Sequence, residues 1–371
     1  MLNAFFINKK PLKCQLYSGI LSANALLSQK ERHMKRTVAF LLCLVMAFSL
    51  CACKGNEPEP TAQPTAQPTP EESDTTTTAA SDSASATTTT TPKITTTTTT
   101  TLPPLPVMSQ YEEKYNENED LIGWIKVDGT PIDYPVMQAE DNFYYLYREF
   151  DGVETKKGSI FADSKCTFTS RTRPANTILY GHNIADGSMF AKLTEYYPWK
   201  HGAATLSQYT NYPTVQFDTI WEEGTYKIFA AIYVNTMEEH GEVFKYYKQR
   251  TIRNEGQFYE YIAKIMDRSV FYTDVDLEYG DELLTLSTCY YPLGKEVDSR
   301  FVVFARRVRE GESAEVDTSK AYINTSPLYF DYYYKVNGGS WAGRKWDTSK
   351  VKGFDDYLKD FPNSGAAEPT M

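Results

Sequence analysis

The sequence predicts a mostly β fold in which eight short strands close, or nearly close, into a barrel. Short apolar and β-branched runs recur along the chain between Gly, Pro and Asp residues, and only one long segment shows strong helical periodicity. The predicted strands are 122–127, 132–136, 159–161, 177–180, 214–221, 226–234, 282–287 and 301–308.

Two helices accompany the predicted strands. Ser109 and Glu112 fit a capping box for a short helix that ends near Asn118, and we expect this helix to cover one end of the barrel. The second helix begins after Asn254 and precedes the seventh strand. Its apolar residues recur with the spacing of one buried stripe, namely Phe258, Tyr261, Ile262, Ile265 and Met266.

The amino-terminal part of the chain is not expected to contribute to the core. Residues 54–107 are rich in Pro, Thr and Ser, which predicts a disordered tether. Residues 34–53 resemble an export signal, because a basic start precedes an apolar run, 38–52, that is shorter than the roughly 20 residues of a membrane-spanning helix. We expect residues 1–33 to lie before the true start at Met34.

The end of this signal resembles a bacterial lipobox. In the segment 50–53 (LCAC), a small residue precedes Cys53, which would be lipidated and become the new amino terminus. The alternative is an uncleaved signal anchor, which would hold the protein in the membrane without lipid. Either arrangement predicts a protein tethered at the extracytoplasmic face of a membrane.

Charge and motifs exclude several function classes. The net charge is −10 with an isoelectric point near 5.1. No basic stripe interleaved with aromatic residues is present, so nucleic acid is not an expected partner. No metal-ligand or nucleotide motif is visible either, and the sequence therefore predicts no cofactor.

The residues that could take part in catalysis lie at the ends of predicted strands. Cys289 ends one predicted strand, Pro292 and Gly294 form a loop, and the next strand carries Arg300. Two such strands lie side by side, which would bring Arg300 close to Cys289. A cysteine reacts as the thiolate and needs a base or a positive neighbour at neutral pH. His182 follows the strand 177–180 and is the histidine best placed to serve as that base.

The folded part contains one other cysteine, Cys166. A Cys166–Cys289 disulfide is the alternative use of the two thiols in an oxidising compartment. Such a bond would remove the nucleophile.

These motifs resemble the sortases, the cysteine transpeptidases of Gram-positive cell surfaces, and most closely their class B branch. The match spans roughly 108–310 and includes TLSTC at 285–289, which fits the family signature TLxTC. It also includes LIGWIKV at 121–127, IDYPV at 132–136, NFYYL at 142–146, KGSIF at 157–161, YGHN at 180–183 and GSMF at 187–190.

The resemblance implies a mechanism and partners. Cys289 would attack a threonine carbonyl in a carboxyl-terminal sorting motif of an exported protein, His182 would move protons, and Arg300 would hold the substrate and its oxyanion. The resulting thioacyl group would pass to an amine of a peptidoglycan cross-bridge or of a pilin lysine. By the same resemblance, the groove would be lined by Asn142, Leu146, Thr285, Ser287 and Thr288, and the loop 241–254 would set specificity.

Two rival functions stay open at this point. One is a hydrolytic cysteine peptidase, although such enzymes usually place the cysteine before the histidine in the chain, whereas here His182 precedes Cys289. The other is a non-catalytic surface lipoprotein that uses the barrel only for binding. Beyond the resemblance, residues 311–371 are rich in aromatic side chains, which predicts an extension that packs on the barrel or on a partner.

Overall fold

The computed structural model describes residues 102–362. The predictions of a leader, a signal, a lipidated Cys53 and most of the tether fall on residues outside this range. Within 102–362, the helices are all too short or too polar to cross a bilayer.

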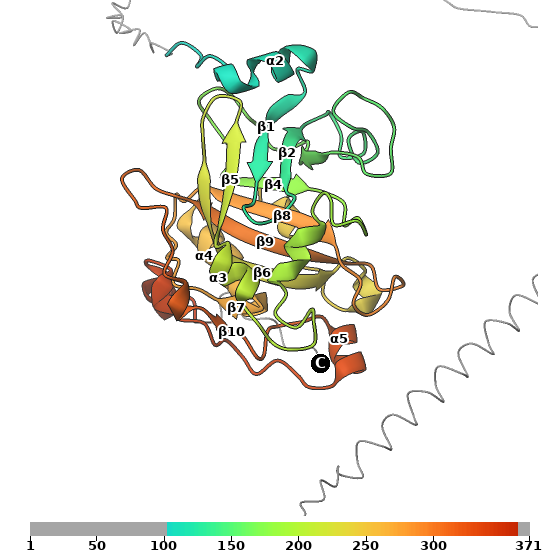
Figure 1. The fold of residues 1–371 in the computed structure, drawn as a ribbon. Helices are drawn as coiled ribbons and strands as arrows, with labels where there is room; N and C mark the ends of the chain where they lie inside the picture. Colours follow the sequence, from blue (N-terminus) through green and yellow to red (C-terminus); the bar gives the residue numbers. More distant parts are fainter. Residues whose placement is uncertain (1–101, 363–371) are drawn as a thin grey trace, which may run out of the picture. The chain divides into compact units, whose positions relative to one another are not determined.

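The predicted eight-stranded barrel is confirmed, and it is closed (Figure 1). Around the barrel the strands follow the order β1-β2-β3-β4-β8-β9-β6-β5, with parallel pairing at β2/β3 and β4/β8 and antiparallel pairing elsewhere. The strands are β1 (Leu121–Lys126), β2 (Asp133–Met137), β3 (Ile160–Ala162), β4 (Asn176–Tyr180), β5 (Thr214–Thr219), β6 (Thr225–Asn235), β8 (Leu283–Cys289) and β9 (Ser299–Arg307).

Helix α4 (Glu255–Arg268) packs on the outside of the barrel and precedes the seventh barrel strand, β8, as predicted. Asn254 caps it, because its Oδ1 accepts a hydrogen bond of 2.9 Å from the Gln257 N–H. Alternate residues of β9 face opposite sides: Phe301 and Val303 fill the barrel, whereas Val302 and Phe304 pack with the α4 stripe. The central strands are therefore apolar on both faces and lie at the middle of the core.

Helix α2 (Ser109–Glu117) exists where the sequence predicts it, but its capping box does not form. Ser109 is already the first helical residue, and Met108 occupies the cap position without a side-chain bond. Tertiary contacts fix the helix start instead, since the Met108 N–H donates to Ile220 O and the Tyr111 hydroxyl donates to Asp218. These contacts attach α2 to the β5 end of the barrel.

The other elements are short. They are α3 (Ser207–Asn211), α5 (Asp331–Asn337), α6 (Phe354–Asp360), β7 (Phe271–Tyr272), β10 (Tyr322–Ile323) and the 3-10 helices η1 (Ala191–Tyr196), η2 (Glu238–His240), η3 (Tyr246–Lys248), η4 (Thr318–Lys320) and η5 (Thr348–Lys350).

The carboxyl-terminal extension packs on the barrel and on α4 (Figure 1, red). Its strand β10 pairs with β7, and Phe330 packs edge-on against Tyr233 of β6. Further along, Arg344 and Trp346 donate hydrogen bonds to the fully buried carboxylate of Asp267 on α4. The aromatic content of this segment is thus explained by burial against the same domain.

This docking predicts that Trp346 stabilises the whole domain. Trp346→Ala should lower the free energy of unfolding by about 3–5 kcal/mol, because it empties a buried indole site and leaves Asp267 with one donor fewer. Urea denaturation of the full chain measures the change. Val336→Ala on the exposed side of α5 is the control and should change stability by less than about 0.5 kcal/mol. Equal effects would show that the extension is not part of the cooperative unit.

Candidate active site

The register of three neighbouring strands places His182, Cys289 and Arg300 in one row. On one side of β8, Cys289 lies directly opposite Arg300 of β9. On the other side, the parallel β4 pairs Tyr180 with Ser287, so two further residues bring His182 level with Cys289. Hydrogen bonds continue past the end of β4, because Gly181 N–H donates to Ser287 O and the Thr288 hydroxyl donates to Gly181 O. The structure therefore brings the three predicted residues together.

Cys289 ends β8 as a half-buried free thiol. Its backbone carbonyl accepts a hydrogen bond of 2.8 Å from the Asn183 side chain, which ties the end of β8 to the segment that carries His182. Cys166 is also free but buried, and burial raises the pKa of its thiol to about 11. The alternative of a Cys166–Cys289 disulfide is therefore wrong.

The imidazole of His182 is fixed by the loop that precedes β3. Its Nε2 lies 2.8 Å from the carbonyl oxygen of Leu146, and the ring of Tyr147 lies 5.9 Å away between centroids. A carbonyl can only accept, so Nε2 carries a proton and Nδ1 is the nitrogen left for proton exchange. Gly181 lets the chain pass close to Ile160 and Phe190, since a Cβ there would lie 2.4 Å from a carbon of Ile160.

Asp298 holds the guanidinium of Arg300. The Arg300 Nη1 donates to Asp298 Oδ1 at 2.6 Å and to Ser299 O at 3.0 Å, and Nη2 donates to Asp298 Oδ2 at 3.3 Å. Thr236 donates to the same carboxylate. Burial alone would raise the pKa of Asp298, but these hydrogen bonds outweigh burial and hold the pKa below its usual range. Arg300 thus keeps two of its five N–H groups available.

The row lies on a cavity of about 530 Å³, here called the catalytic cavity. Four of the five predicted groove residues line it: Asn142, Leu146, Ser287 and Thr288. The loop 241–254, which the resemblance links to specificity, contributes Val243, Phe244, Tyr246 and Tyr247. Sequence reasoning missed Asn235, Thr236 and Tyr291, which also line the cavity. The missed residues lie at the end of β6 and in the β8–β9 loop, where no motif marks them.

Thr285 does not line the catalytic cavity. It is fully buried, and its hydroxyl donates to Asn176 Oδ1 at 2.8 Å. Thr285 and Cys289 lie on the same face of β8. They are four residues apart, which corresponds to about 13 Å along a strand. Thr285 therefore lies under α4, next to Tyr261, and not at the cavity. The prediction of a groove role for Thr285 is therefore wrong, and its role is structural.

A buried carboxylate, Asp163, hydrogen-bonds two residues that line the cavity, Asn142 and Tyr180. The Asp163 side chain is fully buried and accepts hydrogen bonds from Arg250, at 2.5 and 2.9 Å, from Tyr180 at 2.9 Å and from Asn142 at 3.1 Å. Burial alone would raise the pKa of Asp163, but its hydrogen bonds, led by that from Arg250, hold the pKa below its usual range. Nothing in the sequence around Asp163 signals this role, because its partners are remote in the chain.

Acyl transfer by a thiol requires no metal, and the described residues contain no cluster of His, Cys, Asp and Glu able to hold one. The geometry offers a nucleophile, a proton-transfer group and a cation on neighbouring strands. Comparison with known proteins agrees with this chemistry. Residues 125–308 match the model of the Sortase domain.

Two curated relatives support the same family. The chain is 30% identical to "Sortase B" of Staphylococcus aureus over 203 residues, which cover 55% of this chain and 76% of that protein. It is 34% identical to "Sortase B" of Listeria monocytogenes over 172 residues, which cover 46% of this chain and 63% of that protein. The chain belongs to the sortase family. It is a cysteine transpeptidase of the class B type.

Among solved structures, this sortase is similar to one described as a Staphylococcus aureus sortase B-substrate complex. The sequence identity is 30%, the match covers 55% of this chain and 86% of that chain, and the TM-score is 0.47.

We predict that Asp163→Asn destabilises this sortase by about 3 kcal/mol at neutral pH, because it leaves Arg250 without its buried counter-charge. The lowered pKa gives the sign of the pH dependence. The carboxylate contributes fully above the unfolded pKa of about 3.9 and loses its contribution as the pH falls through the lower folded pKa.

Urea denaturation of both proteins at several pH values measures this difference. It should be largest near neutrality and should shrink below about pH 4. Asp128→Asn, in the exposed turn after β1, is the control and should leave stability almost unchanged. A difference that does not change with pH would show that the carboxylate charge is not the stabilising feature.

Proposed function

We propose that this sortase cleaves a sorting motif near the carboxyl terminus of exported proteins and transfers the new carboxyl end to an amine. The observation that supports this most directly is the row of His182, Cys289 and Arg300 along the catalytic cavity. The lining of the cavity mixes aromatic side chains with a few polar groups, which is typical of ligand-binding sites.

In the first half-reaction, the Cys289 thiolate attacks the threonine carbonyl of the motif, and the carbon–nitrogen bond of the next residue breaks. His182 gives the proton from Nδ1 to the departing amine, and a thioester to Cys289 remains. In the second half-reaction, the acceptor amine attacks the thioester, His182 takes the excess proton, and the thiolate leaves. The cycle therefore begins and ends with the same protonation of both residues.

Arg300 is proposed to bind the oxygen that becomes negative during both attacks. Asp298 fixes the plane of the guanidinium, and the Nε–H and one Nη2–H stay available for that oxygen. A donor that is already oriented needs little reorganisation when charge develops, which is the condition for effective oxyanion stabilisation. Asp298 acts in this scheme as a positioning residue, since its contact is with Arg300.

The acceptor and location follow as further parts of the proposal. The amine belongs to a peptidoglycan cross-bridge or to a pilin lysine, and the enzyme is tethered outside the membrane through a lipidated Cys53 or through a signal anchor. The relatives named sortase B support surface anchoring as the setting. A hydrolytic peptidase would pass the same thioacyl group to water, so dependence of the product on added amine separates the two activities.

Cys289→Ala should abolish the thioacyl adduct that intact-mass measurement detects after incubation with a sorting peptide, because the attacking sulfur is gone. Cys166→Ala is the matched control and should form the adduct normally, since that thiol is buried and its raised pKa keeps it protonated. Adduct on the Cys289 variant, or its loss in the Cys166 variant, would reassign the nucleophile. No adduct in the wild-type protein would favour a non-catalytic binding role.

Arg300→Lys should reduce turnover of the same peptide by on the order of a hundredfold, although the positive charge is retained. An ammonium group cannot bond both Asp298 oxygens and still direct donors toward the substrate. Arg307→Lys changes the same residue type on the same strand outside the cavity and should stay near the wild-type rate. Near-normal turnover of the Arg300 variant would leave the oxyanion to backbone donors.

A further inference from the structure

A second, positively charged cleft of about 440 Å³ lies beside α4, and we call it the basic cleft. Lys165, Lys248 and Arg253 line it, together with Arg250, Gln249 and Gln257. Arg250 is neutralised by Asp163. The other three cations are exposed, and within residues 102–362 their side chains form no ion pair.

This concentration of unpaired charge is unusual for this protein. The chain carries 48 acidic against 38 basic residues, and most of its described arginines are paired with carboxylates. A local positive potential on an acidic protein favours a negatively charged ligand at this place.

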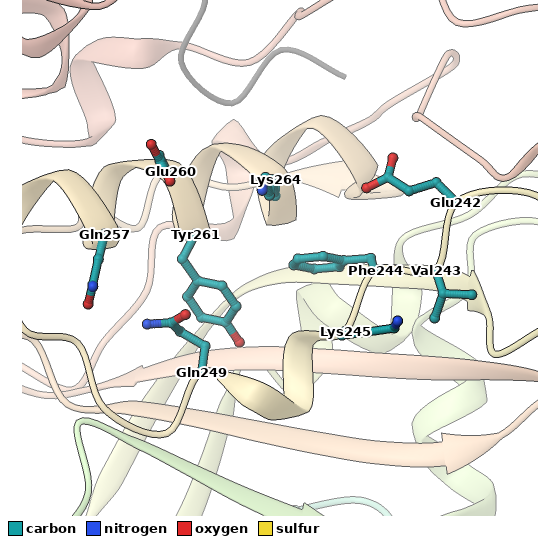
Figure 2. Close-up of a pocket in the computed structure, with 9 residues that line it drawn as sticks. All are labelled: Glu242, Val243, Phe244, Lys245, Gln249, Gln257, Glu260, Tyr261 and Lys264. Carbon is teal, nitrogen blue, oxygen red and sulfur yellow. The ribbon is translucent and has the colours of Figure 1, made fainter. Parts of the chain in front are cut away.

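A third cleft lies between the basic cleft and the catalytic cavity and shares lining residues with both. Figure 2 shows this middle cleft of about 230 Å³ between α4 and the segment 242–249. It shares Val243 and Phe244 with the catalytic cavity, and it shares Gln249 and Gln257 with the basic cleft. In Figure 2 these two pairs lie toward opposite ends of the middle cleft. The middle cleft therefore adjoins both the catalytic cavity and the basic cleft, and the loop 242–253 contributes residues to all three.

We propose that the basic cleft binds an acidic segment of the protein substrate that adjoins the sorting motif in sequence. This rests on the proposed function, because it assumes that the motif occupies the catalytic cavity. The three free cations come from separate segments, after β3, in η3 and before α4. Charges spread in this way match an extended chain with several carboxylates better than one compact anion, which prefers donors that converge on a point.

The binding arm of the test does not require catalysis. Fluorescence anisotropy on full-length Cys289→Ala should show that labelled hexaglutamate binds, that hexaglutamine does not, and that about 0.5 M salt removes binding. Lys248→Glu and Arg253→Glu should each weaken hexaglutamate binding by about fivefold, the upper range for one exposed ion pair. A glutamate at 253 is compatible with the start of α4. Lys345→Glu, which makes the same charge change at an exposed site outside the cleft, should bind like the parent protein.

The activity arm tests continuity with the motif. A sorting peptide that the wild-type enzyme turns over is given a hexaglutamate or a hexaglutamine flank at either end. One hexaglutamate peptide should show a KM at least about fivefold lower than its hexaglutamine match, with the same kcat, and Arg253→Glu should reduce this advantage.

Each failure has a distinct meaning. Hexaglutamate that binds without lowering KM would overturn the proposal and leave the cleft to a separate anion, such as a phosphate polymer. Equal binding of hexaglutamate and hexaglutamine would also overturn it. No turnover of any peptide, with hexaglutamate binding intact, would refute the proposed function instead.

Discussion

The site depends on the main-chain register of β8 between a parallel neighbour, β4, and an antiparallel neighbour, β9. Side chains of a strand alternate between faces, so a slip by one residue would turn Cys289 into the barrel and bury it among apolar residues. Leu284 and Leu286 prevent this slip because they fill the barrel interior, while Ser287 and Cys289 face outward. Hydrophobic burial in the core thus fixes the alignment of the chemical groups outside it.

Around this row, polar groups are supported by other buried polar groups. Asp163 connects Asn142, Tyr180 and Arg250, and the Tyr246 hydroxyl lies 2.7 Å from Ser287 Oγ. The bonds of Tyr180 in β4 and of Ser287 in β8 join barrel strands to the loops that carry Asp163 and Tyr246, so these loops are positioned relative to the strands next to the reacting groups. Satisfied buried networks of this kind favour one geometry, because a shifted loop would leave donors or acceptors unpaired in a dry environment.

The sequence predicts the parts of this architecture that follow from local patterns. The strands, the Asn254 cap and the pairing of Cys289 with Arg300 are encoded in short segments, and the structure reproduces them. The capping box at Ser109 fails because a tertiary bond to Ile220 sets the helix start one residue earlier. The groove role of Thr285, which the family resemblance implied, fails because α4 and Asn176 bury this part of β8. The role of Asp163 arises from contacts with residues remote in the chain, which no local spacing reveals. Asp298 lies only two residues before Arg300, so the sequence holds a local signal for that ion pair that the motif reading did not use.

The reacting groups and most of the cleft-lining residues come from different parts of the fold. The reacting groups lie on or next to barrel strands, whereas the segment 236–253 supplies residues to all three clefts. The carboxyl-terminal extension packs against this segment. The ring centroids of Tyr332 and His240 lie 4.7 Å apart, and a Cβ added to Gly241 would lie 2.7 Å from the backbone nitrogen of Asp331. A loop held in this way loses less conformational entropy when a peptide binds. The aromatic extension packs against the segment that lines the three clefts, although it lines none of them itself.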